Sequence, residues 1–118
     1  MGVSTEPAAV TDIDPEEGRR LVGAGAVLLD VREDDEWQAG HAPDAVHLAM
    51  GLVSDRIGEI PRDRTVVCMC RVGGRSGAVA ATLAGAGFDV RNVAGGMLAW
   101  EAVGLPVVTD GGDPGQII

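Results

Sequence analysis

The sequence predicts an α/β domain with a mostly parallel five-stranded sheet and helices on both faces. Two continuous apolar runs, residues 26–31 and 65–69, are typical of strands that are buried on both faces. Helical patterns alternate with the strand patterns, which favours right-handed crossovers between parallel strands. A length of 118 residues and a hydrophobic content of 46% fit a single domain over residues 1–118.

The N-terminal part of the chain combines a short strand with a well-marked helix start. Residues 1–9 are expected to form a loose terminus, and residues 10–13 a short edge strand. Asp14 has the side chain of an N-cap, and Pro15 suits the first helical position. The helix that they begin is expected to end near residues 22–24, where glycines follow.

The remaining elements alternate between strand and helix patterns. Strands are predicted from short apolar runs, and helices from apolar residues spaced three or four apart. The predicted order is a strand over 26–31, a helix over 32–38, a turn at 40–43, a strand over 45–48, a helix over 52–60, a strand over 65–69, a helix over 76–85, a strand over 90–93 and a helix over 97–103. Trp37 is expected to point inward, and residues 109–118 form a tail whose packing the sequence leaves open.

Charge and cysteine content narrow the classes of function. The formal net charge of −9 argues against nucleic acid and anionic membranes as partners, because both require basic surfaces. No apolar run has membrane-spanning length, and the N-terminus lacks a signal-peptide pattern. Cys68 and Cys70 are separated by one residue and are poorly placed for a disulfide. Reduced thiols fit a cytoplasmic protein.

Residues 70–76, which we call the Cys70 loop, place a thiol where the predicted strand 65–69 ends. In parallel α/β sheets, ligands bind at this carboxyl end of the strands. Gly73 and Gly74 allow the loop to curl so that several backbone N–H groups point inward, and Arg75 adds positive charge. These groups and a helix N-terminus lower the pKa of a thiol, which predicts Cys70 as a catalytic nucleophile.

Three ordered motifs resemble the rhodanese-like sulfurtransferases over residues 13–106. They are the Cys70 loop, Asp30-Val31-Arg32 with Glu36-Trp37 and Gly40-His41-Ala42-Pro43, and the segment 92–100. The resemblance implies a three-layer rhodanese-like fold and a cysteine persulfide relay. Cys70 would take the outer sulfur of a small anionic donor such as thiosulfate and release sulfite. Cyanide, or a protein or small-molecule thiol, would then accept that sulfur.

The resemblance also assigns roles to individual residues. The substrate-binding group that holds the persulfide would be Arg71, Val72, Gly73, Gly74, Arg75 and Ser76. Asp30, Arg32 and His41 would support the loop and the neighbouring strands. No metal and no organic cofactor is implied. His41 and His47 show no compact zinc-ligand spacing with the cysteines, and Cys68 is expected in the core.

Two alternative functions stay open at this point. A sulfur-carrier or redox-sensing binding module would load Cys70 yet show little free turnover. A small phosphatase or arsenate reductase is less favoured, because four residues separate Cys70 from Arg75 and related phosphatases have five. The shorter loop suits a sulfur atom better than a tetrahedral oxyanion. Ser76 is also expected to cap the helix that follows.

Overall fold

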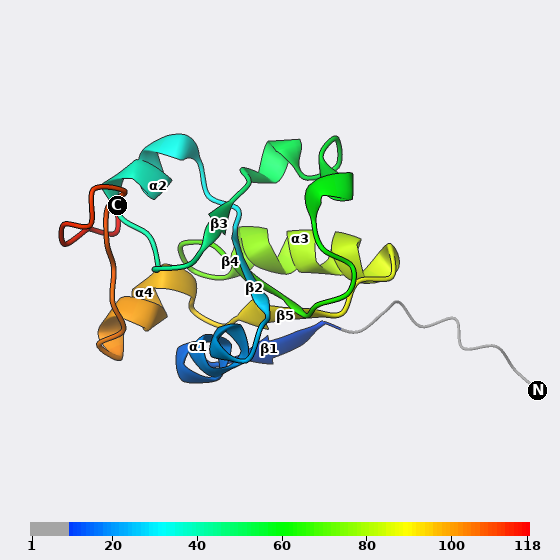
Figure 1. Ribbon diagram of the computed structural model, residues 1–118, viewed down its shortest axis with the longest axis horizontal. Helices are drawn as coiled ribbons and strands as arrows, with labels where there is room; N and C mark the ends of the chain where they lie inside the picture. The colour runs from blue at the N-terminus through cyan, green and yellow to red at the C-terminus, as the bar shows by residue number, and fades with distance from the viewer. Residues whose placement is uncertain (1–9) are drawn as a thin grey trace, which may run out of the picture.

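The computed structural model describes residues 10–118, and the predicted loose terminus over residues 1–9 lies outside them. Five strands form one sheet in the order β1-β5-β4-β2-β3 (Figure 1). They are β1 (Thr11–Ile13), β2 (Val27–Asp30), β3 (Val46–His47), β4 (Val66–Met69) and β5 (Val90–Val93). All four strand pairings are parallel, which confirms the predicted sheet.

Helices cover both faces of this sheet. The helical elements are α1 (Pro15–Gly23), α2 (Asp34–Ala39), α3 (Gly74–Gly85), α4 (Gly96–Ala102) and the 3₁₀ turns η1 (Met50–Leu52) and η2 (Ile57–Glu59). One face packs against α3 and the 3₁₀ region, and the other against α1 and α4 (Figure 1). Each face has its own buried apolar cluster, so the molecule has three layers. No helix within residues 10–118 has the length and apolar character to cross a membrane.

The start of α1 follows the sequence prediction. Asp14 is the N-cap, and its carboxylate accepts a hydrogen bond from the Glu17 backbone N–H at 2.8 Å. Pro15 occupies the first turn, where its missing N–H leaves no bond unmade. Local side-chain chemistry is sufficient to set this boundary.

The helix predicted over residues 52–60 is wrong, because the segment forms the two separate 3₁₀ turns η1 and η2. Val53 and Ile60 are buried, whereas Leu52 is 46% exposed, so the apolar residues do not share one helical face. Gly51 and Gly58 lower the helix propensity of the segment further. Val53 and Ile60 are therefore buried separately in the core, and the segment does not form the regular helix that the sequence predicts.

The start of α3 also differs from expectation. The helix begins at Gly74, and Gly73 is its N-cap with φ of +105°, a conformation that favours glycine. Ser76 therefore lies inside the first turn, and the prediction that it caps the helix is wrong. Its buried hydroxyl instead faces the Cys70 loop and β5.

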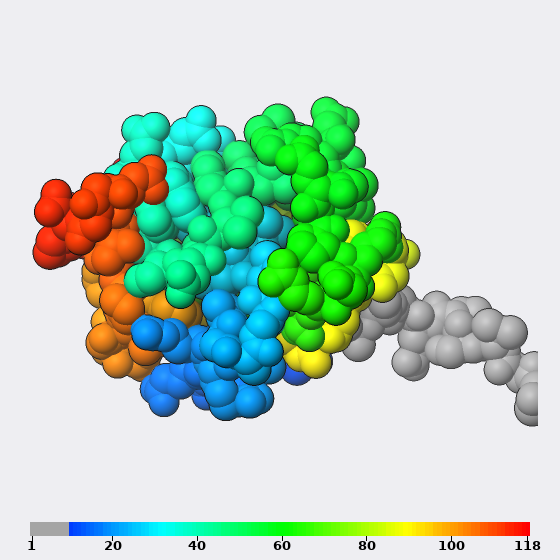
Figure 2. Space-filling model, in the orientation of Figure 1, coloured from blue at the N-terminus to red at the C-terminus, as the bar shows by residue number. Residues whose placement is uncertain are grey.

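The C-terminal tail packs on the body of the domain. His41 and Val108 exchange two backbone hydrogen bonds of 2.8 Å, and Gln116 donates to the Ala39 carbonyl at 2.8 Å. Figure 2 shows the tail (red) lying beside the region of α2 and α4. Ile117 joins the apolar cluster on the α4 side of the sheet. The question that the sequence left open is thus answered by packing against α2 and α4.

Candidate active site

The Cys70 loop connects the end of β4 to the start of α3. The strand β4 lies between β2 and β5, so the loop occupies the middle of the carboxyl edge of the sheet. The Cys70 residue is only 1% exposed, and its main chain continues a strand in which every residue is buried. The predicted nucleophile thus lies where an open parallel sheet places its ligand site.

Backbone groups of α4 hold the loop in a curled conformation. Met97 N–H donates to the Cys70 carbonyl at 2.8 Å, and Leu98 N–H donates to the Arg71 carbonyl at 3.1 Å. Gly96 permits this approach: its φ is +55°, and a Cβ there would clash with the carbonyl oxygen of Cys70. Because these carbonyls point toward α4, the loop N–H groups are free to face the sulfur.

The Cys70 thiol is surrounded by hydrogen-bond donors. The Gly73 N–H donates to Sγ at 3.1 Å, and the Ser76 hydroxyl oxygen lies 3.2 Å from Sγ. Burial raises the pKa of Cys70, but hydrogen bonding by the Ser76 hydroxyl and by the N–H groups of Ser76, Gly73 and Val72 outweighs it. The pKa of the thiol therefore lies below its ordinary value of 9.0, and the α3 N-terminus adds to the stabilisation of an anion. Such a thiol is a candidate nucleophile.

Arg75 supplies the positive charge that the sequence predicts in the loop, and in the structure its guanidinium forms an ion pair with Glu36 of α2. Its two terminal nitrogens donate to the two Glu36 carboxylate oxygens at 2.7 and 2.8 Å. Hydrogen bonds from Arg75 hold the pKa of Glu36 at about 2, and those to Glu36 raise the pKa of Arg75. Arg75 thus joins the loop to α2, and its role in binding substrate stays a prediction.

The other loop residues form the rim around the thiol. Val72 is 55% exposed, and Gly74 has open space around its Cα. The exposed Arg71 donates from Nε to the backbone oxygen of Ile118 at 3.1 Å, which connects the loop to the C-terminal tail. The predicted role of Arg71 in binding substrate stays a prediction.

Asp30 and Arg32 form a fully buried ion pair behind the loop. Arg32 Nη2 lies 2.8 Å from the Asp30 carboxylate and also donates to the Gly40 carbonyl at 2.8 Å. Arg32 Nη1 donates to the Glu36 carbonyl at 3.3 Å. The pair connects the end of β2 to α2. The supporting role that the resemblance implied for these residues stays a prediction.

The two histidines take part in packing around α2. The His41 ring stacks on Trp37 with centroids 3.6 Å apart, and its Nε2 lies 2.9 Å from the Asp110 carboxylate of the tail. His47 also stacks on this half-buried indole, with ring centroids 4.9 Å apart. Within residues 10–118, no three His, Cys, Asp or Glu side chains gather as a metal site would require.

Cys68 lies two residues before Cys70 on β4 and is fully buried in the apolar cluster beneath α3. Burial and the neighbouring Cys70 raise the pKa of Cys68 to about 12. Both cysteines are free. Cys68 is thus a core residue, as expected, with no tendency to ionise near neutral pH.

Sequence reasoning missed two polar residues that shape the site. Glu36 was noted only as part of a motif, and nothing in the sequence indicated its contact with Arg75. Asn92, on β5, accepts a hydrogen bond from Ser76 Oγ at 2.6 Å and donates to the Gly73 carbonyl at 3.1 Å. A polar side chain inside a predicted buried strand is a usable signal, because buried amides are almost always hydrogen-bonded.

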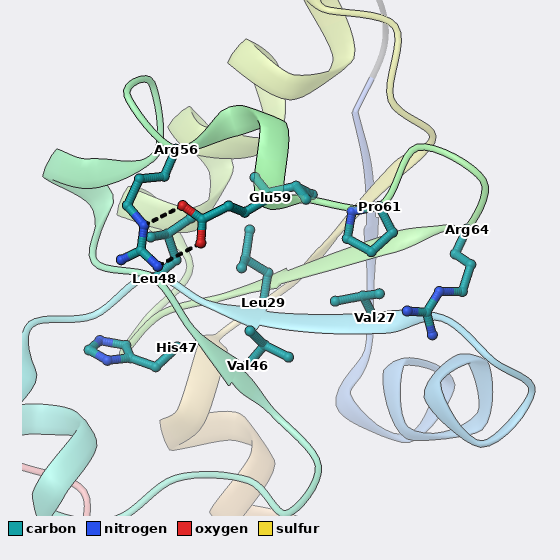
Figure 3. A pocket seen from close by; sticks show the side chains of 10 residues that line it. Val27, Leu29, Val46, His47, Leu48, Arg56, Glu59, Pro61 and Arg64 are labelled. Carbon is teal, nitrogen blue, oxygen red and sulfur yellow. Dashed lines mark hydrogen bonds and ion pairs between the residues drawn. The ribbon is translucent and has the colours of Figure 1, made fainter.

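A separate cavity of about 190 Å³ lies beside the β3 edge of the sheet (Figure 3). Its lining residues are Val27, Leu29, Val46, His47, Leu48, Arg56, Glu59, Ile60, Pro61 and Arg64. Arg56 and Glu59 form an ion pair with each other at its rim. The cavity contains no residue of the Cys70 loop and no thiol, so the candidate active site is the loop and not this cavity.

Comparisons with known proteins agree with this assignment. A family model described as the rhodanese-like domain matches residues 14–103. A sulfurtransferase of Allochromatium vinosum is 43% identical over 106 residues, which cover 87% of this chain and 99% of that protein. The thiosulfate sulfurtransferase GlpE of Pseudomonas savastanoi pv. phaseolicola is 42% identical over 91 residues, which cover 76% and 86% of the two chains.

The fold has a close counterpart among solved structures. A rhodanese-related protein from Thermoplasma volcanium superimposes with a TM-score of 0.80 at 26% sequence identity. The superposition covers 85% of this chain and 99% of that protein. The likeness therefore extends over most of the chain and is not confined to the motif regions.

Proposed function

This chain belongs to the rhodanese-like domain family and is a sulfurtransferase, and we propose that Cys70 carries the transferred sulfur as a persulfide. The observation that carries the proposal is the surroundings of the Cys70 sulfur. Sγ accepts a backbone hydrogen bond at 3.1 Å, lies 3.2 Å from a buried hydroxyl, and has a lowered pKa. A thiolate is the nucleophile that sulfur transfer requires.

The reaction has two steps that share this one sulfur atom. In the first step, the Cys70 thiolate attacks the outer sulfur of thiosulfate: a new Sγ–S bond forms, the donor S–S bond breaks, and sulfite leaves with the electron pair. In the second step, cyanide or a thiolate attacks the outer sulfur of the persulfide, and the Cys70 thiolate is regenerated. Because each step returns a stable species, we expect ping-pong kinetics.

The charges around the loop suit a small anionic donor. The protein has a formal net charge of −9, yet Arg71 and Arg75 both belong to the Cys70 loop. The N-terminus of the 12-residue helix α3 adds partial positive charge. Thiosulfate, the donor in the name of the Pseudomonas relative, fits this local field. The acceptor is proposed as a thiol or cyanide from the chemistry of the second step.

Intact-mass measurement after exposure to thiosulfate tests the proposal. We expect the wild-type chain to gain the mass of one sulfur atom on Cys70 and to release sulfite. The Cys70→Ser variant is expected to do neither, whereas the matched Cys68→Ala variant loads as the wild type does. Full turnover in Cys70→Ser would overturn the mechanism. Loading of the wild type with negligible turnover on cyanide and small thiols would indicate a sulfur carrier instead of a free-standing enzyme.

A further inference from the structure

The Ser76 hydroxyl contacts two hydrogen-bond acceptors but has only one proton to donate. Its oxygen lies 2.6 Å from Oδ1 of Asn92 and 3.2 Å from Sγ of Cys70. Both contacts can be hydrogen bonds at once when Cys70 is a thiol, because S–H then donates to Ser76 and Ser76 donates to Asn92. When Cys70 is a thiolate, Ser76 can donate to only one of the two.

The orientation of the Asn92 amide is determined by its other contacts. Its Nδ2 donates to the Gly73 carbonyl at 3.1 Å and to the Asp12 carboxylate at 3.2 Å. A flipped amide would place Oδ1 against these two oxygen acceptors, which is unfavourable. Asn92 Oδ1 therefore faces Ser76 as a fixed acceptor.

The position of this amide follows from strand register. Asn92 pairs with Asp12 of β1 on one side and with Cys68 of β4 on the other. Residues in register on neighbouring strands share a face of the sheet, so Asn92 lies on the face that α3 covers. It is 4% exposed, and the first turn of α3 brings Ser76 against it.

We propose that Asn92 is a positioning residue that controls the direction of the Ser76 proton and, through it, the balance between thiol and thiolate at Cys70. When Cys70 ionises, its proton passes to solvent, and the Ser76 proton turns from Asn92 Oδ1 to Sγ. The backbone N–H groups favour the thiolate, and the Asn92 oxygen opposes it by competing for the hydroxyl. The inference deepens the proposed function, on which it rests, since the thiolate is the group that takes up sulfur.

The other titratable groups near the sulfur do not act through Ser76. Arg75 lies within electrostatic range of the thiol and is ion-paired with Glu36, and Cys68 lies two residues earlier on β4. The buried Asp30–Arg32 ion pair lies at the end of the neighbouring strand β2. Asp12 lies on β1 and accepts a hydrogen bond from the Asn92 amide. The two ion pairs are unaltered by a change at Asn92 that leaves the fold intact.

The test is a double-mutant cycle with substitutions at Asn92 and Ser76. For each variant, the rate at which iodoacetamide alkylates Cys70 is measured as a function of pH, and peptide mass spectrometry quantifies the alkylated Cys70. Asn92→Leu removes the competing acceptor, so we expect alkylation at pH 6 to be about fivefold faster than in the wild type, with a midpoint at lower pH. Ser76→Ala is expected to slow alkylation. Adding Asn92→Leu to Ser76→Ala is expected to cause no further acceleration, because the coupling passes through the hydroxyl.

Slower alkylation in Asn92→Leu, or the same change with and without Ser76, would overturn the proposal. Those results indicate that Asn92 merely supports the loop through the Gly73 carbonyl. Circular dichroism checks folding, and Asn92→Ala takes the place of Asn92→Leu in the cycle if the larger side chain is not accommodated. Alkylation needs no sulfur donor, so failure of thiosulfate to load Cys70 would contradict the proposed function without changing the outcome of this cycle.

Discussion

Cys68 and Cys70 lie two residues apart at the end of one strand, and they are buried to almost the same extent, at 0% and 1% exposure. Their pKa values nevertheless shift in opposite directions: that of Cys68 rises to about 12, and that of Cys70 falls below 9.0. The comparison shows that burial alone does not determine the state of a thiol. The Cys68 sulfur lies deeper and its pKa is raised mainly by desolvation, whereas the Cys70 sulfur lies nearer the surface and has hydrogen-bond donors aimed at it, which outweigh its desolvation.

The difference arises from where the sheet ends. Cys68 lies inside β4, whose backbone groups are used in pairing with β2 and β5. Its side chain meets the apolar cluster beneath α3. Cys70 follows the last residue of the strand, where N–H groups of the next turn are free to face a side chain. Parallel sheets thus provide a site for a nucleophile at this edge.

The largest expected effect is the difference in reactivity between the two thiols. The thiolate fraction follows the pKa, which is raised to about 12 for Cys68 and lowered for Cys70, so Cys70 is expected to be alkylated at pH 7 at least about a hundredfold faster than Cys68. Peptide mass spectrometry after limited iodoacetamide treatment measures both sites in one sample. Equal labelling of the two cysteines would contradict the predicted difference in their reactivity.

Substitutions of Cys68 are expected to change stability and not reactivity. Cys68→Ser buries a hydroxyl among apolar side chains and is expected to lower the free energy of unfolding by about 1–3 kcal/mol. Cys68→Ala, the matched control, is expected to cost about 1 kcal/mol by leaving a small cavity. Urea unfolding measures both. Loss of sulfur loading in the folded Cys68→Ala variant would assign Cys68 a chemical role that we do not expect.

The two loop glycines offer a matched test of the backbone donors. Gly73 has φ of +105°, and a Cβ there would lie 3.4 Å from Gly95 N, so Gly73→Ala is expected to cost about 1–2 kcal/mol of stability. Displacement of its N–H is expected to slow alkylation of Cys70 about tenfold. Gly74→Ala has open space around it and no positive φ, so both quantities should stay near wild type. Identical behaviour of the two variants would argue against a special role of the Gly73 donor.

The smallest expected effect concerns the ion pair beside the thiol. Hydrogen bonds from Arg75 lower the pKa of Glu36 from 4.5 to about 2, so the contribution of the pair to stability is present above pH 4.5 and is lost as the pH falls toward 2. Since the pair is partly exposed, we expect a contribution of about 1 kcal/mol. Urea unfolding of Glu36→Gln at pH 7 and pH 3 should show a smaller pH difference than the wild type. If Glu36→Gln and the wild type lose the same free energy of unfolding between pH 7 and pH 3, the ion pair does not contribute to the loss of stability in acid.

Sequence patterns were informative where neighbours along the chain determine structure. Asp14 and Pro15 marked the start of α1, and the apolar runs located β2 and β4. The same reasoning failed over residues 52–60, because Val53 and Ile60 are anchored separately in the core and not on one helical face. It also failed at Ser76, because the left-handed Gly73 starts the helix earlier.

The sequence by itself determined that a cysteine ends a buried strand and is followed by a glycine-rich turn and a helix, since these are properties of adjacent residues. Only the tertiary structure decided which polar groups become partners. Glu36 meets Arg75 across 39 residues, and Asn92 meets Ser76 across 16. Such pairings depend on strand register and helix packing, which act between distant segments and leave no local pattern. The thiol is therefore encoded locally, whereas the environment that controls its ionisation is assembled by the fold.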